Sequence, residues 1–159
     1  MKNTFKKYSQ FYDLLYKDKN YQKEVDYIDE LIKSNGKNIK SILDLGCGSG
    51  IHAEMLYDKG YDILGVDFSQ EMLIEARKSA KKSNKKIEYK CQNITELSIN
   101  NKYDAVTSLF HVVSYLNSNE DLIKTFKNIN NHLNKGGLFI FDFWYGPGVL
   151  SDKPVTKIK

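Results

Sequence analysis

Short runs of apolar residues recur along the chain, separated by polar segments or by apolar positions at helical spacing. The runs are four to six residues long and rich in Ile, Val, Leu and Phe, which is typical of strands buried inside a sheet. They span residues 41–45, 63–66, 87–91, 104–109 and 138–141. The third is the weakest, because it is short and flanked by lysines. Strands that alternate with helices in this way predict a parallel α/β sheet covered on both faces.

The segments between the strands carry apolar residues at the three- and four-residue spacing of amphipathic helices. The first stripe lies in residues 25–32 and stops at Asn35-Gly36, a pair that commonly ends helices. Ser69 is a predicted N-cap, and Ser118–Asp121 has the form of a capping box. The helix that follows this box is expected to end at residues 135–137, which read Lys-Gly-Gly.

Right-handed crossovers between consecutive strands predict a doubly wound, Rossmann-like and mainly parallel sheet in the order 3-2-1-4-5. The order reverses between the first and fourth strands. Ligands of such sheets bind beyond the carboxyl ends of the strands at that reversal. We therefore expect the functional residues to lie in four segments, 46–50, 67–68, 92–94 and 109–115, around one site.

The first strand runs directly into glycines at positions 46, 48 and 50. Glycine lets the backbone turn tightly and lets a ligand approach where a Cβ would collide. The N–H groups at the start of the following helix add polar contacts at the same place. The second strand ends in Asp67, where a carboxylate can accept hydrogen bonds from ribose hydroxyls. Together the loop and the acid predict a nucleoside site.

The glycine spacing separates two kinds of nucleoside site. A dinucleotide fingerprint has a third glycine three positions after the second, and Ile51 occupies that place here. The arrangement of Asp44 before Gly46, Gly48 and Gly50 resembles motif I of the class I S-adenosylmethionine-dependent methyltransferases. The resemblance implies S-adenosyl-L-methionine as the cofactor. An NAD-dependent enzyme is the less favoured alternative.

The expected cofactor site draws on several strand ends. Phe68 and Met72 are candidates to enclose the adenine, and core packing is the alternative for Met72. Asn93 stands where the family usually has an acid for the adenine amino group, and its amide oxygen can accept the same hydrogen bond. The cofactor-binding candidates are Asp44, Gly46, Cys47, Gly48, Gly50, Asp67, Phe68, Met72, Gln92, Asn93, Ile94 and Leu109.

His111 follows the fourth strand and is expected to face the transferred methyl group as the catalytic residue. It can accept a proton from a substrate amine or hold a sugar hydroxyl. The alternative is an imidazole that only caps backbone groups. The Asn/Asp-Pro-Pro-aromatic motif of enzymes that methylate nucleic-acid amino groups is absent from this segment, which argues against nucleic acid as substrate or partner.

The N-terminal segment is rich in tyrosine, and with residues 143–148 it resembles N-methyltransferases that act on nucleotide-linked amino sugars. This resemblance implies a small-molecule acceptor. It makes Tyr16 and Tyr21 candidates for contacts with substrate or cofactor, and Tyr115 is a further candidate to orient the acceptor. The alternative for each is an aromatic side chain that packs on the core.

The net charge of +4 comes almost entirely from lysine, since Arg77 is the only arginine. Nucleic-acid binders favour arginine forks, and the one dense lysine cluster, in residues 78–86, lies where cations complement a helix C-terminus. No apolar run is long enough to span a membrane. The two cysteines have neither disulfide-framework nor metal-site spacing. We expect a cytoplasmic protein without a metal site or a membrane partner.

We expect one methyltransferase domain over residues 1–159, with a helical lid at 1–36, a Rossmann-like core at 37–145 and a tail at 146–159. The resemblance implies a further helix and an antiparallel strand pair after the fifth strand, for which the tail is too short. The sequence thus predicts a C-terminally truncated domain whose fifth strand is an open edge, available to pair in a dimer. The alternative is a non-catalytic S-adenosylmethionine-binding or interaction module.

Overall fold

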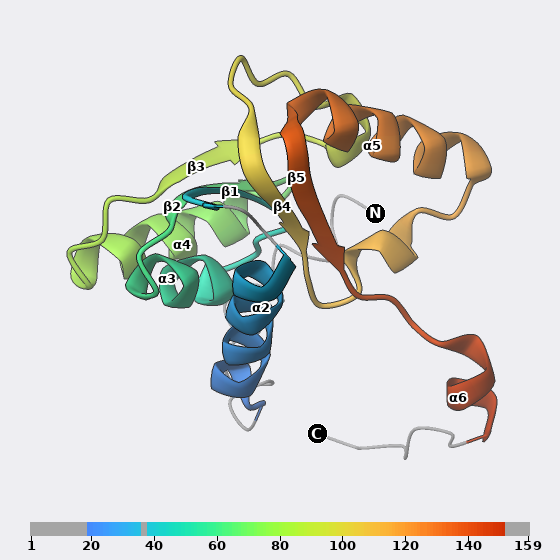
Figure 1. Cartoon of the computed structure of the whole chain (residues 1–159), viewed down its shortest axis with the longest axis horizontal. Helices are drawn as coiled ribbons and strands as arrows, with labels where there is room; N and C mark the ends of the chain where they lie inside the picture. Colours follow the sequence, from blue (N-terminus) through green and yellow to red (C-terminus); the bar gives the residue numbers. More distant parts are fainter. Residues whose placement is uncertain (1–18, 36–37, 152–159) are drawn as a thin grey trace.

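The computed structural model describes residues 19–35 and 38–151. Strands and helices alternate along this part of the chain (Figure 1). In chain order the elements are α2 (Tyr21–Asn35), β1 (Ser41–Leu45), α3 (Ile51–Asp58), β2 (Asp62–Asp67), α4 (Gln70–Lys82), β3 (Glu88–Cys91), η1 (Ile94–Glu96), β4 (Tyr103–Ser108), η2 (Val112–Tyr115), α5 (Asn119–His132), β5 (Leu133–Phe141) and α6 (Gly146–Ser151).

The strands form one sheet in the order β3-β2-β1-β4-β5, and each neighbouring pair is parallel. This confirms the predicted doubly wound α/β fold and its strand order. Parallel neighbours need crossover connections, which the intervening helices supply. The carboxyl ends of all five strands consequently face the same edge of the sheet.

Helices cover both faces of the sheet: α2, α3 and α4 lie on one face, and α5 with η1 lies on the other (Figure 1). The alternation of side chains along β1 serves both layers. Ile42 belongs to the core under α2, α3 and α4, whereas Leu43 and Leu45 belong to the core under α5. All three side chains are fully buried.

The N-terminal helix packs on this core. In α2, Val25, Ile28 and Ile32 are buried and contact the same cluster as the β1 and β2 side chains. The predicted stripe and its end at Asn35 are confirmed. Residues 1–18 of the expected lid, including Tyr16, lie outside the described residues.

The predicted end of the helix after Ser118 was wrong. Helix α5 ends at His132, and the segment expected to terminate it forms a bulge inside β5 instead. Leu133 pairs with Tyr103, while Leu138 pairs with Ala105, so four residues of β5 lie opposite a single residue of β4. Gly136 has φ +80°, which suits a glycine in such a bulge. The Lys-Gly-Gly sequence is therefore a strand irregularity set by pairing with β4.

A carboxylate ties the amino ends of three strands together. Asp104 accepts hydrogen bonds from the backbone N–H groups of Lys40 and Ser41, from the Ser41 hydroxyl and from the Asn134 amide, at 2.8–3.0 Å. Burial raises the pKa of Asp104, but these hydrogen bonds outweigh it and lower the pKa to about 2. These hydrogen bonds fix the amino ends of β1, β4 and β5, at the edge of the sheet opposite the expected site.

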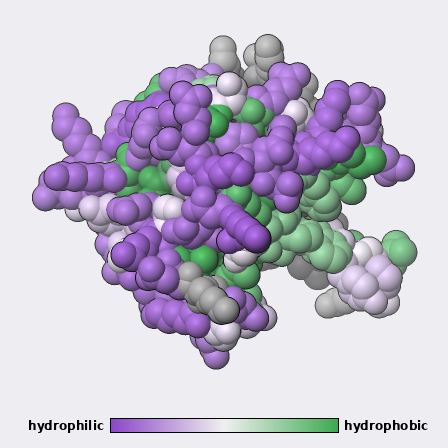
Figure 2. Space-filling model, turned by 45° about the horizontal axis from the view of Figure 1, so that its top comes forward, coloured by the Kyte–Doolittle hydropathy of each residue, from purple (hydrophilic) through white to green (hydrophobic). Residues whose placement is uncertain are grey.

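Strand β5 is the last strand of the sheet, and aromatic side chains gather beside it. We call Phe126, Phe139, Phe141 and Phe143 the aromatic edge. Their neighbouring ring centres are 4.7–6.0 Å apart. Phe143 keeps 58% of its surface exposed. Figure 2 shows hydrophobic residues gathered between the body of the molecule and the lobe that α6 forms.

Across the described residues, none of the helices combines the length and the apolar character needed to cross a bilayer.

Candidate functional site

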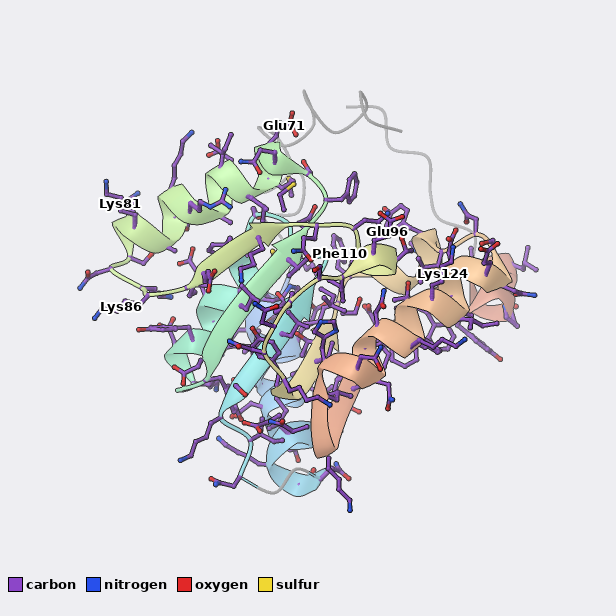
Figure 3. All side chains as sticks on the ribbon, turned by 90° about the horizontal axis from the view of Figure 1, so that it is seen from above. Glu71, Lys81, Lys86, Glu96, Phe110 and Lys124 are labelled. Atoms are coloured by element: carbon purple, nitrogen blue, oxygen red, sulfur yellow. The ribbon has the colours of Figure 1, made fainter. Side chains whose placement is uncertain are left out.

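The loops that follow β1 to β4 meet at the carboxyl edge of the sheet. The N–H groups of Gly46 and Cys47 both donate to the carbonyl of Val66, at 2.7 and 3.1 Å. The N–H of Gln92 donates to the carbonyl of Asp67, at 3.0 Å. In Figure 3, Glu71, Glu96 and Phe110, which follow β2, β3 and β4, lie on this side of the molecule, away from Lys81 and Lys86. The four segments expected around one site are thus neighbours.

The three loop glycines all have positive φ, at +74° for Gly46, +56° for Gly48 and +85° for Gly50. A Cβ on Gly46 would lie 2.4 Å from Val112 Cγ2, and one on Gly50 would lie 2.6 Å from the Tyr89 hydroxyl oxygen. Both distances are far below ordinary contact. Glycine is therefore required here by the backbone turn and by packing within the protein, before any ligand is considered.

Asp67 holds the glycine loop in place. One carboxylate oxygen accepts the Gly48 N–H at 2.9 Å, and the other accepts the Ser69 N–H at 2.8 Å. Burial raises the pKa of Asp67, although the hydrogen bonds from Ser69 and Gly48 partly offset it. Each carboxylate oxygen can accept a second hydrogen bond. The side chain can therefore fix the loop and still bind ribose hydroxyls.

Asp44 is almost completely buried in the middle of β1. Its Oδ1 accepts a hydrogen bond from the Thr107 hydroxyl at 2.8 Å, and its buried Oδ2 has no hydrogen-bond partner among the described residues. Burial raises the pKa of this carboxyl group. An unsatisfied buried acceptor next to the glycine loop is costly, and a donor from a ligand or water would relieve it.

The two residues expected to enclose an adenine differ in exposure. Phe68 has 54% of its surface exposed at the end of β2. Met72 is buried at the start of α4, and its Cε lies 3.2 Å from the position of a Cβ on Gly48. Met72 therefore packs beneath the loop, and Phe68 is the one that presents a ring to the outside.

The segment after β3 is held by its own side chains. The Gln92 amide donates to the carbonyl of Ser98 at 3.0 Å and accepts the Ser98 N–H at 2.9 Å. The Asn93 Oδ1 accepts the Thr95 N–H at 3.1 Å, which caps η1. Ile94 packs against the core under α5. Asn93 retains one lone pair on its amide oxygen for a ligand.

The segment after β4 has an unusual backbone. Leu109 is buried, and Phe110 and His111 follow it with φ of +66° and +63°. Two consecutive non-glycine residues in the left-handed region are strained, and such strain concentrates at functional sites. The ring of Trp144 lies 4.7 Å from the His111 ring. Tyr115, in η2, is 65% exposed.

Tyr21 lies at the start of α2, beside the segment after β4. The Lys19 ammonium connects the two, at 4.8 Å from the centre of the Tyr21 ring and 3.6 Å from the centre of the Phe110 ring. The same ammonium lies 2.9 Å from Glu24, which also contacts His52 at 2.9 Å. Lys19 thus links Tyr21 to Phe110, the residue before His111.

Three residues near this edge were not found by sequence reasoning. The ring of Tyr89 packs against Gly65, where an added Cβ would lie 2.6 Å from Tyr89 Cδ1. Burial raises the pKa of the Tyr89 hydroxyl. Val112 fills the space left by Gly46. Asp142 accepts the His111 N–H at 2.7 Å. A signal for Asp142 existed, since a carboxylate directly after the fifth strand meets the same criterion as Asp67.

The sequence profile of a methyltransferase domain matches residues 42–137. A dTDP-3-amino-3,4,6-trideoxy-alpha-D-glucopyranose N,N-dimethyltransferase of Streptomyces venezuelae is 30% identical over 143 residues, which cover 89% of this chain and 59% of the relative. A dTDP-3-amino-3,6-dideoxy-alpha-D-glucopyranose N,N-dimethyltransferase of Streptomyces fradiae is 25% identical over 141 residues, covering 87% of this chain and 54% of the relative.

Among solved structures, an S-adenosylmethionine-dependent methyltransferase from Clostridium acetobutylicum superposes with a TM-score of 0.78 at 39% identity, over 89% of this chain and 58% of that one. The chain thus spans between 54% and 59% of the length of these relatives. The profile covers more than half of the chain, including the glycine loop and Asp67. The chain belongs to the S-adenosylmethionine-dependent methyltransferase family.

Proposed function

We propose that the chain binds S-adenosyl-L-methionine at the carboxyl edge of its sheet and transfers the methyl group to a small molecule. The acceptor class we propose is an amino sugar linked to a nucleotide, or a related metabolite. The observation that carries the proposal is Asp67, which joins the glycine loop to the start of α4 while keeping lone pairs for a ribose. The dTDP-amino-sugar specificity of two relatives supports the acceptor class.

The residues at this edge fit such a cofactor. Asp67 would accept the ribose hydroxyls, Phe68 would cover the adenine, and Asn93 would accept its amino group. The unsatisfied Asp44 Oδ2 lies in the strand that leads into the loop and can take a further donor. Once bound, the cofactor supplies a methyl group already activated on a sulfonium sulfur.

The chemistry then asks the protein for alignment and for proton acceptance. The lone pair of the acceptor nitrogen forms the new N–C bond while the C–S bond breaks and its electron pair goes to sulfur. The methylated nitrogen carries one proton too many, and the imidazole of His111 can accept it. Tyr21 and Tyr115 would orient the acceptor and help to exclude water.

The first test uses the purified 159-residue chain. We expect S-adenosylhomocysteine to bind in calorimetry and NAD to give no signal. Asp67→Ala should weaken the binding by about 10- to 100-fold, because two hydrogen bonds to a charged group are lost. Asp62→Ala, at the exposed start of the same strand, is the matched control and should bind as the parent does. Equal affinities for both variants would remove Asp67 from the site.

The second test is methyl transfer to a panel of nucleotide-linked amino sugars, followed by mass spectrometry. We expect a mass gain of one or two methyl groups on the amino nitrogen. Binding without turnover on any acceptor would support the second candidate, a non-catalytic S-adenosylmethionine-binding or interaction module.

We also propose that the partners do not include nucleic acid, that the location is cytoplasmic, and that two copies pair along β5. Of the clustered lysines, Lys78 pairs with Glu75, and Lys85 pairs with Asp58 and Glu54, which supports a solvated surface over a nucleic-acid patch. Both cysteines are unpaired, in keeping with a reducing compartment.

A further inference from the structure

Two segments far apart in the sequence are tied together around His111. The Asp142 N–H donates to the carbonyl of Ser108 at 3.3 Å, and Asp142 Oδ1 accepts the His111 N–H at 2.7 Å. The Trp144 N–H donates to the Ser114 hydroxyl at 3.0 Å. Three hydrogen bonds thus join the chain after β5 to the chain after β4.

The bond to Asp142 explains how the strained backbone persists. The left-handed conformations of Phe110 and His111 are strained, and such conformations persist only where the surroundings over-determine them. A short hydrogen bond from the His111 N–H to a carboxylate is a charge-assisted one and is among the stronger kinds. Asp142 therefore helps to hold the backbone that carries the imidazole.

The second oxygen of the same carboxylate faces the imidazole. Asp142 Oδ2 lies 3.4 Å from His111 Nδ1. Nδ1 is buried and makes no completed hydrogen bond within the described part of the chain. Because a buried unsatisfied nitrogen is costly, a small rotation of the carboxylate that closes this distance is favourable. Hydrogen bonds at catalytic sites are often long without ligand and tighten in its presence.

The hydrogen bond at one imidazole nitrogen decides which nitrogen carries the proton. A carboxylate has no hydrogen to donate, so Asp142 keeps the proton on Nδ1 of the neutral ring. Nε2 is then left with its lone pair, which is the form that accepts a proton. The rings of Phe110 and Trp144 flank the imidazole, with centres at 5.6 and 4.7 Å, and limit its rotation.

We infer that Asp142 is a positioning residue for His111: one carboxylate oxygen fixes the strained backbone, and the other holds the imidazole in the tautomer that accepts the acceptor's proton at Nε2. The inference deepens the proposed function and rests on the role proposed there for His111. Asp142 touches neither substrate nor cofactor in this role. It acts only through the histidine.

The tautomer can be measured directly by nitrogen-15 NMR of the imidazole rings, without any turnover. The chain has three histidines, so the spectrum is simple. His52 and His132 have their own neighbours and serve as internal references: His52 Nε2 lies 2.9 Å from a Glu24 carboxylate oxygen, and the two ring nitrogens of His132 lie 2.7 and 3.0 Å from the carbonyl oxygens of Asn128 and Ile99. We expect the neutral His111 of the parent to carry its proton on Nδ1. A proton on Nε2 in the parent would overturn the inference.

The variant Asp142→Asn keeps an amide oxygen for the His111 N–H and turns the other position into a donor. We expect this variant to move the proton of His111 to Nε2 while the signals of His52 and His132 stay unchanged. With a working acceptor, kcat should fall by about 100-fold or more with little change in KM, because Nε2 can no longer accept a proton. Asp62→Asn is the matched control.

The two readouts separate this inference from the proposed function. If no acceptor is methylated by the parent, the proposed function fails, and the tautomer of the parent still decides about Asp142. If the parent is active and Asp142→Asn leaves both the His111 tautomer and kcat unchanged, the inference fails while the proposed function stands. Unchanged affinity for S-adenosylhomocysteine in the variant verifies that its fold is intact.

Discussion

Gly46 is the residue at which backbone conformation and packing impose the same requirement. Its φ is +74°, and a Cβ there would collide with both methyl groups of Val112, at 2.4 and 2.7 Å. Gly60 has a similar φ of +96°, but nothing lies within 4 Å of a Cβ at that position. Comparing alanine substitutions at the two glycines therefore separates the free-energy cost of a left-handed backbone from the cost of a steric clash.

We expect Gly60→Ala to lower the free energy of unfolding by about 1–2 kcal/mol, through backbone strain alone. For Gly46→Ala we expect the free energy of unfolding to fall by about 1–3 kcal/mol more, because the added methyl group overpacks against Val112. Urea unfolding of the two variants measures the difference. The double variant Gly46→Ala/Val112→Ala should recover part of the loss, and equal losses for the two glycines would contradict this account.

Asp44 makes the stability of the fold depend on pH, and the sign of this dependence follows from its burial. Its pKa in the folded chain is raised by burial, so the folded chain binds a proton where the unfolded chain has released it. The contribution of Asp44 to stability is therefore present at low pH. It is lost as the pH rises from the ordinary value of about 4 through the raised value.

Asp44→Asn removes this dependence, while its amide oxygen can still accept the Thr107 hydroxyl. We expect the variant to exceed the parent in free energy of unfolding at about pH 8.5, and the gap to narrow as the pH falls to the ordinary carboxyl pKa of about 4. Urea unfolding at both pH values measures the gap. A gap for Asp44→Asn that widened toward low pH would refute the assignment.

Individual residues also show which contacts could be predicted from the sequence and which could not. Asp67 could be proposed as a site residue from the sequence because it ends an apolar strand next to a glycine loop, and both are local patterns. Asp142 meets the same local criterion, but its partner, the strained His111, is 31 positions away and its conformation follows from packing. The buried acceptors of Asp44 and the placement of Tyr89 over Gly65 likewise depend on which strands become neighbours.

At the scale of elements, two helix N-caps provide a matched pair. Ser69 accepts the Met72 N–H at 3.3 Å at the start of α4, and Ser118 accepts the Asp121 N–H at 3.0 Å at the start of α5. Helix α4 starts beside Asp67, whereas α5 lies on the other face of the sheet. Both helices thus start with a serine cap, but only α4 starts next to Asp67.

We expect Ser69→Ala and Ser118→Ala each to lower the free energy of unfolding by about 1 kcal/mol, since each leaves one helix N–H without its acceptor. Only Ser69→Ala should also weaken the binding of S-adenosylhomocysteine, because it loosens the helix start that Asp67 holds. Thermal unfolding and calorimetry give the two quantities. Comparable weakening by Ser118→Ala would mean that the caps act through global stability.

Element boundaries were predictable where they depend on local chemistry. Both serine caps and the strand order followed from the sequence, because capping and right-handed crossovers are local or general rules. The end of α5 could not be predicted in this way, since Gly136 and Gly137 belong to a bulge that exists only where β5 pairs with β4. A Cβ on Gly137 would lie 2.8 Å from the carbonyl oxygen of Asp104, a contact that no local pattern reveals.

At the scale of the whole molecule, β5 serves two surfaces. Its carboxyl end leads into Asp142 and the proposed methyl-transfer site, while Phe139 and Phe141 of the aromatic edge lie on the face of the sheet that α5 covers. A surface depression of about 450 Å³ continues this edge over α5, lined by Ile123, Phe126, Lys127, Asn130 and Asn131. An exposed parallel strand flanked by apolar rings is a template for another strand.

The occupant we propose for the aromatic edge is the β5 strand of a second copy, since each copy offers the same edge strand of the described sheet and the same rings. Two edges related by a twofold axis would bury each other's phenylalanines. We expect concentration-dependent dimerisation in analytical ultracentrifugation. Phe143→Lys should shift the equilibrium to monomer by at least about tenfold, because a charge would have to be desolvated in the interface.

Tyr27→Lys is the matched control for this prediction, because Tyr27 is 61% exposed on α2, across the sheet from α5. It should leave the dimerisation constant unchanged. A parent that stays monomeric at all concentrations would rule out the second copy as the occupant. If both variants weakened association equally, contacts other than the aromatic edge would be responsible. Binding of S-adenosylhomocysteine by the monomeric Phe143→Lys variant would then show that the cofactor site needs only one chain.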